Sequence, residues 1–510
     1  MKPRPKSKPQ RPGRIPKRYP GRIDLSEPES RRSERETTTP EPRKGRTTRP
    51  RPSPPPPRLP IVPPRSEGNV PRGGATHELH VAPLDRLANA AAEAARLTTQ
   101  AVFQEGHRAD RTIASYLRGR RDLALPDQRF VAQAVFALFR WHGWITDLHL
   151  KRLEESMLLA WLLDAPTVHP ACRHWCHQVR RNPEHLIPVG DAPNWTARAE
   201  GLKRFAGGRS VNADPWRLFP EWLRRVIPRT GSGKTHTLEL LHALQTRPPL
   251  WVRAQGTEPR VIWSELRDAG ITPWTHRRLE AAAKLPPDCD VYHLPAFERG
   301  QLEIQDIASQ VVGFVCDPEP GERWWDACAG AGGKAIHLAS LMRGKGVVVA
   351  TDSSAFRLKE AVRRARKSPY RNITTKAWNG KHVAGKPGSF DGVLVDAPCT
   401  GIGTWRRNPD ARWSCDPKGV DRLAAIQAEL LGQAARGVRP GGTLVYSVCT
   451  ISQPETHDVV EGFLANHAEF SLDRFPNPLD ESPCDGTLTI WPQAADSDAM
   501  FVARFIRKPS

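Results

Sequence analysis

Short apolar runs alternate with helical stretches from about residue 299 onward, and this alternation limits the fold more than any other feature of the chain. The apolar runs are Arg323–Trp325, Val347–Ala350, Gly392–Val395 and Thr443–Tyr446, and the helical stretches are Ile304–Val312, Ala335–Met342, Ala355–Arg366 and Leu423–Val438. Strands that alternate with helices predict a mainly parallel, doubly wound sheet, which is an α/β architecture. Such sheets bind ligands at the carboxyl ends of their strands, so functional residues are expected directly after the apolar runs.

A glycine-rich turn follows the first of these runs. It reads Asp326-Ala-Cys-Ala-Gly-Ala-Gly-Gly-Lys334, and the next strand ends in Thr351-Asp352, 26 residues after Asp326. Glycines let the backbone approach a ligand closely, and the helix that follows presents unpaired N–H groups. An acidic residue at about this separation suits a ribose hydroxyl. The turn, the helix and the acid together predict a nucleotide-like cofactor.

Two cysteines occupy the ends of the two later strands. Asp396-Ala-Pro398-Cys399-Thr-Gly401 follows the strand Gly392–Val395, and Cys449 follows the strand that begins at Gly441-Gly442. The alternative is a pair of buried structural thiols, which is the commoner fate of cysteine. Their position at parallel strand ends beside a cofactor turn favours catalysis.

Three other segments precede this region. Residues 1–75 hold 20 Lys and Arg, 7 Asp and Glu and 19 Pro, so we expect a disordered, basic, proline-rich tail. It is either a solvated tail or an arm that adds non-specific RNA affinity, and both readings stay open. Residues 76–212 show helical spacing of apolar residues, and residues 213–298 mix strands at Leu250–Arg253 and Val291–Leu294 with a helix at Ile262–Leu266.

Composition excludes several classes of protein. The chain has no run of 18 apolar residues, so we expect no transmembrane helix, and its N-terminus lacks the apolar stretch of a signal peptide. Nine cysteines spread over 510 residues suggest reduced thiols in a cytoplasmic protein. A net charge of +21 favours RNA or DNA as the partner.

These motifs resemble the Sun/RsmB family of RNA (cytosine-5)-methyltransferases over roughly residues 85–508. The matching segments are Gln305-Asp306, the Cys328–Lys334 turn, Asp396-Ala-Pro-Cys-Thr-Gly, Arg406–Trp413, Val445-Tyr-Ser-Val-Cys-Thr, Trp491-Pro492 and Phe501–Phe505. The resemblance implies a Rossmann-like methyltransferase domain over 299–510. It also implies an all-α NusB-like RNA-binding domain over 76–212 and a small RRM-like α+β module over 213–298.

The resemblance also implies the chemistry. Cys449 is the nucleophile that adds to carbon 6 of a cytosine, Cys399 assists release of the product and Asp396 contacts the ring. The methyl donor is S-adenosylmethionine. The cofactor residues implied are Cys328, Ala329, Gly330, Ala331, Gly332, Gly333, Lys334, Asp352, Asn379 and Asp396. Arg406, Arg407 and Arg412 are expected to face phosphate, and Trp405 and Trp413 are the best candidates for stacking on bases.

The expected substrate is a structured RNA, with ribosomal RNA favoured, and the target base has to be exposed or flipped. Two alternatives stay open: a tRNA methyltransferase of the same chemistry, and a non-catalytic RNA-binding assembly factor that kept the fold. The second is favoured by departures from the family pattern at Gly330, Ala331, Ala335 and His457. We expect a monomer.

Two other motifs carry less weight. Gly231-Ser-Gly-Lys-Thr235 has part of a phosphate-binding loop but lacks its first glycine and a preceding buried strand. The His and Cys residues between His169 and His177 match no standard zinc spacing, so we expect neither ATP nor metal.

Overall fold

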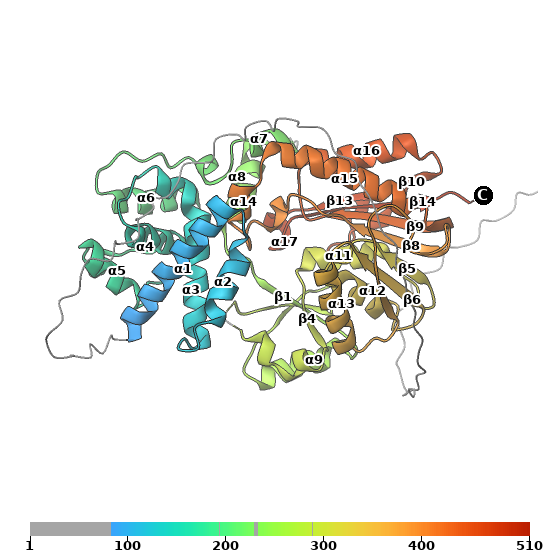
Figure 1. The fold of residues 1–510 in the computed structure, drawn as a ribbon, viewed down its shortest axis with the longest axis horizontal. Helices are drawn as coiled ribbons and strands as arrows, with labels where there is room; N and C mark the ends of the chain where they lie inside the picture. The colour runs from blue at the N-terminus through green and yellow to red at the C-terminus, as the bar shows by residue number, and fades with distance from the viewer. Residues whose placement is uncertain (1–82, 193, 229–232, 288, 510) are drawn as a thin grey trace, which may run out of the picture. The chain divides into compact units, whose positions relative to one another are not determined.

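The computed structural model describes residues 83–192, 194–228, 233–287 and 289–509. The predicted tail, 1–75, lies outside the described residues. Along the chain the described residues form a helical part, a small antiparallel sheet and a larger, mostly parallel sheet (Figure 1).

The helical part begins with a helix whose small side chains are buried at three- and four-residue spacings, among them Ala88, Ala91 and Ala95 of α1. Helix α4 is its centre, because ten of its twelve residues are buried. The helices are α1 (Pro83–Glu105), α2 (Ala109–Arg118), α3 (Leu125–Thr146), α4 (Leu153–Asp164), α5 (Cys172–Val179), α6 (Trp195–Ala206), α7 (Leu223–Val226) and α8 (Gly233–Gln245). The resemblance to NusB stays a prediction.

The helical part extends further along the chain than the sequence pattern indicates. Leu223 of α7 and Leu240, Leu241 and Leu244 of α8 belong to the same hydrophobic cluster as α1, α3 and α4. The predicted start of the mixed module at 213 therefore lies inside the helical part, and the first strand follows Pro249.

The small sheet has the strand order β2-β3-β1-β4, with every pair antiparallel. Its elements are β1 (Leu250–Ala254), α9 (Pro259–Asp268), β2 (Trp274–Thr275), β3 (Ala282–Leu285), α10 (Pro295–Glu298) and β4 (Leu302–Ile304). The predictions of β1 and α9 are confirmed. The predicted strand Val291–Leu294 is wrong: Val291–His293 is a turn of 3-10 helix, and Pro295, which has no N–H to donate to a ladder, begins α10. Strand β1 pairs with β3 on one side and with β4 on the other.

The larger sheet has the strand order β10-β14-β9-β8-β5-β6-β7, and β13 also pairs with β14. Strands β5 to β9 are parallel and β14 is antiparallel to β9, which confirms a mainly parallel sheet. The strands are β5 (Arg323–Asp326), β6 (Val347–Asp352), β7 (Ile373–Ala377), β8 (Phe390–Asp396), β9 (Val438–Val448), β10 (Phe470–Leu472), β13 (Thr487–Ile490) and β14 (Met500–Arg507). A separate short pair consists of β11 (Phe475–Pro476) and β12 (Pro483–Cys484).

Helices cover both faces of this sheet. Successive side chains of a strand point to opposite faces, so neighbouring residues of β5 pack against different helices. Trp324 packs in one hydrophobic cluster with α11 and α12, and Trp325 packs in another with α15 and α16. Figure 1 shows the two layers on opposite sides of the strands. The helices of this part are α11 (Ile307–Cys316), α12 (Gly333–Leu341), α13 (Ala355–Lys367), α14 (Ala411–Ser414), α15 (Pro417–Ala435), α16 (His457–Asn466) and α17 (Pro492–Ala495).

The strand order reverses at β5, which has β6 on one side and β8 on the other. A crevice opens at such a reversal, outside the carboxyl ends of the strands. The predicted cofactor turn follows β5, and the two cysteines follow β8 and β9.

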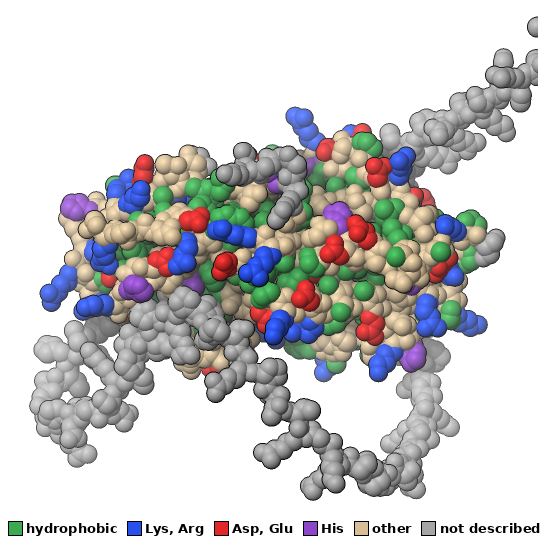
Figure 2. All heavy atoms as spheres, turned by 90° about the horizontal axis from the view of Figure 1, so that it is seen from above, with side chains coloured by type: hydrophobic (Ala, Val, Ile, Leu, Met, Phe, Trp, Pro, Cys, Tyr) green, Lys and Arg blue, Asp and Glu red, His purple; other side chains and the backbone are tan. Residues whose placement is uncertain are grey.

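None of the helices in the described part of the chain is long and apolar enough to cross a bilayer. On the face drawn in Figure 2, Lys and Arg side chains alternate with Asp and Glu side chains among the coloured residues.

Candidate active site

The turn between β5 and α12 has a backbone that favours glycine. Gly330 has φ +56° and Gly332 has φ +84°, in the left-handed region that other residues adopt at a cost. Hydrogen bonds fix the turn: Ala329 N–H donates to Thr351 O (2.8 Å), and Gly332 N–H donates to Ala329 O (2.8 Å). A Cβ added at Gly330 would have no atom within 4 Å, so this side of the turn is open beside the start of α12. That open cradle fits a nucleotide-like cofactor.

Asp352 ends β6 and holds the cofactor turn. Its Oδ2 accepts from Gly330 N–H (3.0 Å), and its Oδ1 accepts from Ser354 N–H (2.8 Å). The predicted contact with a ribose hydroxyl stays a prediction, but the structure gives this carboxylate the further task of shaping the turn. Asn379 is exposed and accepts a hydrogen bond from Lys381 N–H (3.1 Å), so its predicted cofactor contact also stays a prediction.

Asp326, at the end of β5, is fully buried, and neither of its carboxylate oxygens has a hydrogen-bond partner among the described residues. Burial, followed by the charge of Asp396, raises the pKa of Asp326 to about 8. This carboxyl is therefore mostly protonated at neutral pH, directly below the turn.

The two predicted catalytic cysteines lie together. Strands β8 and β9 are parallel neighbours with Asp396 opposite Ser447, so the residues after them meet at one edge. Cys399 Sγ lies 3.3 Å from Cys449 Sγ, and both residues are half-buried. The sequence prediction that the two strand ends bring these thiols to one site is confirmed.

The two thiols have different acidities. The hydrogen bond from Cys399 lowers the pKa of Cys449 against the opposing effect of burial, and the nearby cations of Lys334 and Arg407 lower it further. The same hydrogen bond, together with burial, raises the pKa of Cys399 well above its ordinary value. Cys449 is therefore the more acidic thiol of the pair and Cys399 the less acidic one.

A charged group lies beside the thiols. Lys334 Nζ donates to Asp396 Oδ2 (2.8 Å), and Ser447 Oγ donates to Asp396 Oδ1 (2.8 Å). Burial works against the charged form of Lys334, but Asp396 raises its pKa, so it is a cation at neutral pH. The ion pair links the cofactor turn to the end of β8.

Glu455 organises the site, and the sequence motifs do not identify it. It is fully buried, and its carboxylate accepts four hydrogen bonds. Oε1 accepts from Thr400 N–H (2.8 Å) and Gln427 Nε2 (3.1 Å), and Oε2 accepts from Thr400 Oγ1 (2.6 Å) and Thr450 Oγ1 (3.3 Å). Thr400 and Thr450 are the residues directly after the two cysteines, so one carboxylate ties both cysteine loops together. The sequence signal for it is weak: an acidic residue six positions after Cys449.

The arginines predicted to face phosphate require correction. Arg412 is fully buried and donates to Gln245 Oε1 (2.6 Å) and to the carbonyl oxygens of Leu218, Leu244 and Trp405. Arg406 is 3% exposed and donates to Ser497 O (2.9 Å) and to Asp496 Oδ1 (3.0 Å). Both guanidinium groups bind protein carbonyls where two parts of the chain meet, so neither is open to phosphate.

Arg407 is the member of the set that reaches solvent. Its side chain is 43% exposed and forms an ion pair with Asp498. Contact between Arg407 and phosphate stays a prediction.

The two tryptophans considered for base stacking are also structural. Trp405 is fully buried, 6.4 Å between ring centroids from Phe219, and Trp413 donates from Nε1 to Phe139 O (2.8 Å). The remaining motifs lead to no ligand site. Within the described residues no group of three or more His, Cys, Asp or Glu side chains is arranged to hold a metal ion. Residues 231 and 232 of the segment 231–235 lie outside the described residues, and the remaining three begin α8.

The chain is similar in sequence to ribosomal RNA methyltransferases. The model of 16S rRNA methyltransferase RsmB/F matches residues 314–506. A probable ribosomal RNA small subunit methyltransferase B of Synechocystis is 32% identical over 298 residues, 56% of this chain and 66% of that protein. Ribosomal RNA small subunit methyltransferase B of Salmonella paratyphi B is 31% identical over 295 residues, 57% of this chain and 67% of that protein. The chain thus spans about two thirds of the length of these relatives. The crystal structure of PH0851 has the same fold, with a TM-score of 0.65 at 23% identity over 83% of this chain and 99% of that chain.

Proposed function

The chain belongs to the RsmB/F family of 16S rRNA methyltransferases, which use S-adenosylmethionine, and from this membership we propose that it methylates carbon 5 of a cytidine in ribosomal RNA through a covalent Cys449 adduct. The observation that carries the proposal is the 3.3 Å contact between Cys399 and Cys449, in which Cys449 has the lower pKa. Addition to an aromatic ring needs a thiolate, and a neighbouring thiol has to stay protonated until that addition is complete.

The cofactor fits the open cradle at Gly330. Residues Cys328–Lys334 would surround it, with Asp352 holding the turn, and when bound S-adenosylmethionine supplies an electrophilic methyl group. The ion pair between Lys334, the last residue of this turn, and Asp396 supports a cofactor site close to Cys449, because both groups influence the pKa of that thiol.

Cys449 begins the reaction on the base. Its thiolate adds to carbon 6 of the cytosine, and the electron pair of the 5,6 double bond moves to carbon 5, which becomes nucleophilic enough to take a methyl group. Asp396 is placed to hydrogen-bond the ring and stabilise the adduct, since Lys334 and Ser447 already fix its carboxylate.

Cys399 completes the reaction. While Cys449 is a thiolate, its charge and hydrogen bond hold the pKa of Cys399 high. Once the sulfur of Cys449 is bonded to carbon 6, that charge is gone and the pKa of Cys399 falls. Cys399 then loses its own proton to solvent and, as a thiolate, takes the proton from carbon 5, while the 5,6 double bond reforms and Cys449 leaves as a thiolate. The order of the two steps follows from this coupling.

The helical part and the small sheet are proposed to bind the RNA, on the basis of their resemblance to NusB and RRM domains. The direct test of the whole proposal is bisulfite sequencing of total RNA from a deletion strain and its parent. We expect one ribosomal cytidine that resists conversion in the parent to become convertible in the deletion strain. Loss of protection in a tRNA would assign that substrate instead, and unchanged protection in all RNA would favour a non-catalytic factor.

Cofactor binding gives a quantitative prediction. Asp352→Ala removes the acceptor for Gly330 N–H and Ser354 N–H, so the turn loses its support and the Kd for S-adenosylmethionine should rise about tenfold or more. Calorimetry measures this. Asp421→Ala, an exposed carboxylate on α15, is the matched control and should leave the Kd unchanged. Equal affinities in both variants would show that Asp352 does not support the cofactor turn.

A further inference from the structure

A large cavity lies beside the candidate active site, at the junction of the helical part, the small sheet and the loop that carries Arg406 and Arg407. Its volume is about 1100 Å³. We call it the Trp274 cavity, after the one large aromatic side chain among its lining residues that is mostly exposed: Trp274 of β2 is 54% exposed.

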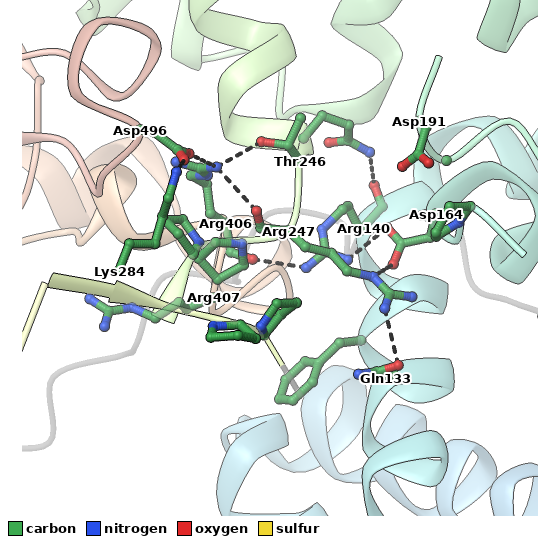
Figure 3. A pocket seen from close by; sticks show the side chains of 18 of the residues that line it. Gln133, Arg140, Asp164, Asp191, Thr246, Arg247, Lys284, Arg406, Arg407 and Asp496 are labelled. Carbon is green, nitrogen blue, oxygen red and sulfur yellow. Dashed lines mark hydrogen bonds and ion pairs between the residues drawn. The ribbon is translucent and has the colours of Figure 1, made fainter. Parts of the chain in front are cut away.

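The lining of the Trp274 cavity carries excess positive charge. Six Lys and Arg side chains line it against three Asp side chains. These are Arg140, Arg198, Arg247, Lys284, Arg406 and Arg407, with Asp164, Asp191 and Asp496. Figure 3 shows how two of the carboxylates are used: Arg140 and Arg247 both bind Asp164, and Lys284 and Arg406 both bind Asp496. Each of these carboxylates is shared by two cations, so each group of two cations and one carboxylate has a net charge of +1.

Three of the six cations reach solvent. The exposed fractions of their side chains are 30% for Arg247, 34% for Lys284 and 43% for Arg407. Nη2 of Arg247 is itself buried and has no hydrogen-bond partner among the described residues. The deeper arginines, Arg140 and Arg406, hold the parts of the chain together. The outer three each form one ion pair, with Asp164, Asp496 and Asp498, and keep part of their side chains in solvent, where an anion can reach them.

Trp274 offers a flat surface next to these charges. Lys284 lies opposite Trp274 in the pairing of β2 with β3, and its Nζ is 5.1 Å from the centroid of the indole. Trp251 packs against the same ring edge-on, with 5.7 Å between centroids, and Trp251 Nε1 donates to Asp496 O (2.8 Å). The exposed ring is thus held in place from the protein side. An exposed, immobilised aromatic ring beside cations is the arrangement that binds an unpaired base and its phosphate.

The Trp274 cavity is also connected to the thiol pair. Gly403 N–H donates to Cys449 O (3.0 Å), and Arg407 follows only four residues later, at most about 14 Å along the chain. A strand with its target base at Cys449 therefore reaches the cavity within a few nucleotides.

We propose that the Trp274 cavity binds a single-stranded segment of the RNA substrate next to the target cytidine, with Trp274 stacked on a base and Arg247, Lys284 and Arg407 on phosphates. This inference rests on the proposed function for the identity of the polyanion. The aromatic surface favours a nucleic acid over an acidic peptide, and stacking requires an unpaired base.

Binding of a short single-stranded RNA, measured by fluorescence anisotropy, tests the stacking. Trp274→Ala should raise the Kd about 5- to 150-fold, and Trp274→Phe should restore most of the affinity. Tyr292→Ala is the matched control, because Tyr292 is 67% exposed on the same part of the chain but does not line the cavity. The Kd for S-adenosylmethionine should stay unchanged in all three variants, which shows that they are folded. Equal Kd values for Trp274→Ala and Tyr292→Ala would overturn the proposal.

Two further measurements identify the ligand chemistry. Lys284→Gln should reduce the slope of log K against log salt concentration by about 0.7, and Arg260→Gln, an exposed arginine on α9, should not. A duplex RNA of the same length should lose no affinity with Trp274→Ala, since its bases are paired; an equal loss would overturn stacking. If Trp274 governs RNA binding but no cytidine is methylated, the proposed reaction fails and the cavity assignment stands. If methylation proceeds and Trp274→Ala binds RNA normally, the cavity assignment fails alone.

Discussion

A Cys399→Ala enzyme mixed with RNA and S-adenosylmethionine is expected to stall as a protein–RNA complex that survives denaturing electrophoresis. Cys449 can still add to carbon 6 and the base can still accept the methyl group. The variant lacks the thiol that takes the proton from carbon 5, so Cys449 is not released. Labelled RNA on a denaturing gel should show a slowly migrating band for this variant.

Cys449→Ala should form no such complex, and methyl transfer should fall by at least about 1000-fold, because the thiolate proposed to add to the ring is gone. Cys415→Ala, a half-buried cysteine outside the pair, is the control and should behave as the parent. A band with Cys449→Ala instead would reverse the two roles. No band with either variant would make both thiols structural.

The pH dependence of this complex gives an independent check. The hydrogen bond from Cys399 is the largest influence that lowers the pKa of Cys449. Without it, the pKa of Cys449 rises and less thiolate is present at neutral pH. The complex should therefore form more slowly in Cys399→Ala than the adduct forms in the parent, and its rate should increase as the pH rises through the higher pKa. A rate that does not change with pH would show that adduct formation does not depend on the ionisation of Cys449.

The placement of the two cysteines could be predicted because it depends on topology alone. Each cysteine directly follows an apolar run, and parallel strands bring their carboxyl ends to one edge of the sheet. The same reasoning found the cofactor turn after β5. Strand β7 was missed because it lacks an apolar run: Ile373–Ala377 lies at the edge of the sheet and is half-buried or exposed throughout.

The arginines show where the reasoning from sequence failed. A positive charge in a loop beside an active site predicts phosphate only if the side chain reaches solvent. Arg412 instead binds the carbonyl oxygens of Leu218 and Leu244, more than 160 positions earlier in the chain. Local sequence carries no record of such partners, so burial of these charges could not be anticipated. For the same reason the sequence does not indicate that Trp274, in a two-residue strand, lines a cavity.

Glu455 is the remaining residue that sequence could not reveal, and its replacement should have a large effect on turnover. Glu455→Ala removes the acceptor of four hydrogen bonds, leaves Thr400 N–H without its partner in a buried place, and leaves Gln427 Nε2 with Pro398 O alone. The loops that carry the two thiols then lose their common support. We expect kcat to fall about 100-fold, because displacement of reacting groups by about 1 Å costs this much, while the Kd for S-adenosylmethionine stays near its parental value.

Glu455→Gln separates positioning from folding. The amide oxygen can still accept from Thr400 N–H, and the amide nitrogen can donate to the two threonine hydroxyls, so most of the activity should return. The negative charge of Glu455 contributes to the raised pKa of Cys399, so its removal should lower that pKa. Product release, measured as decay of the denaturation-resistant complex, should then extend to lower pH than in the parent. Glu461→Ala, an exposed acid on α16, should change neither kcat nor this profile. Full activity in Glu455→Ala would show that the thiols keep their places without the shared carboxylate.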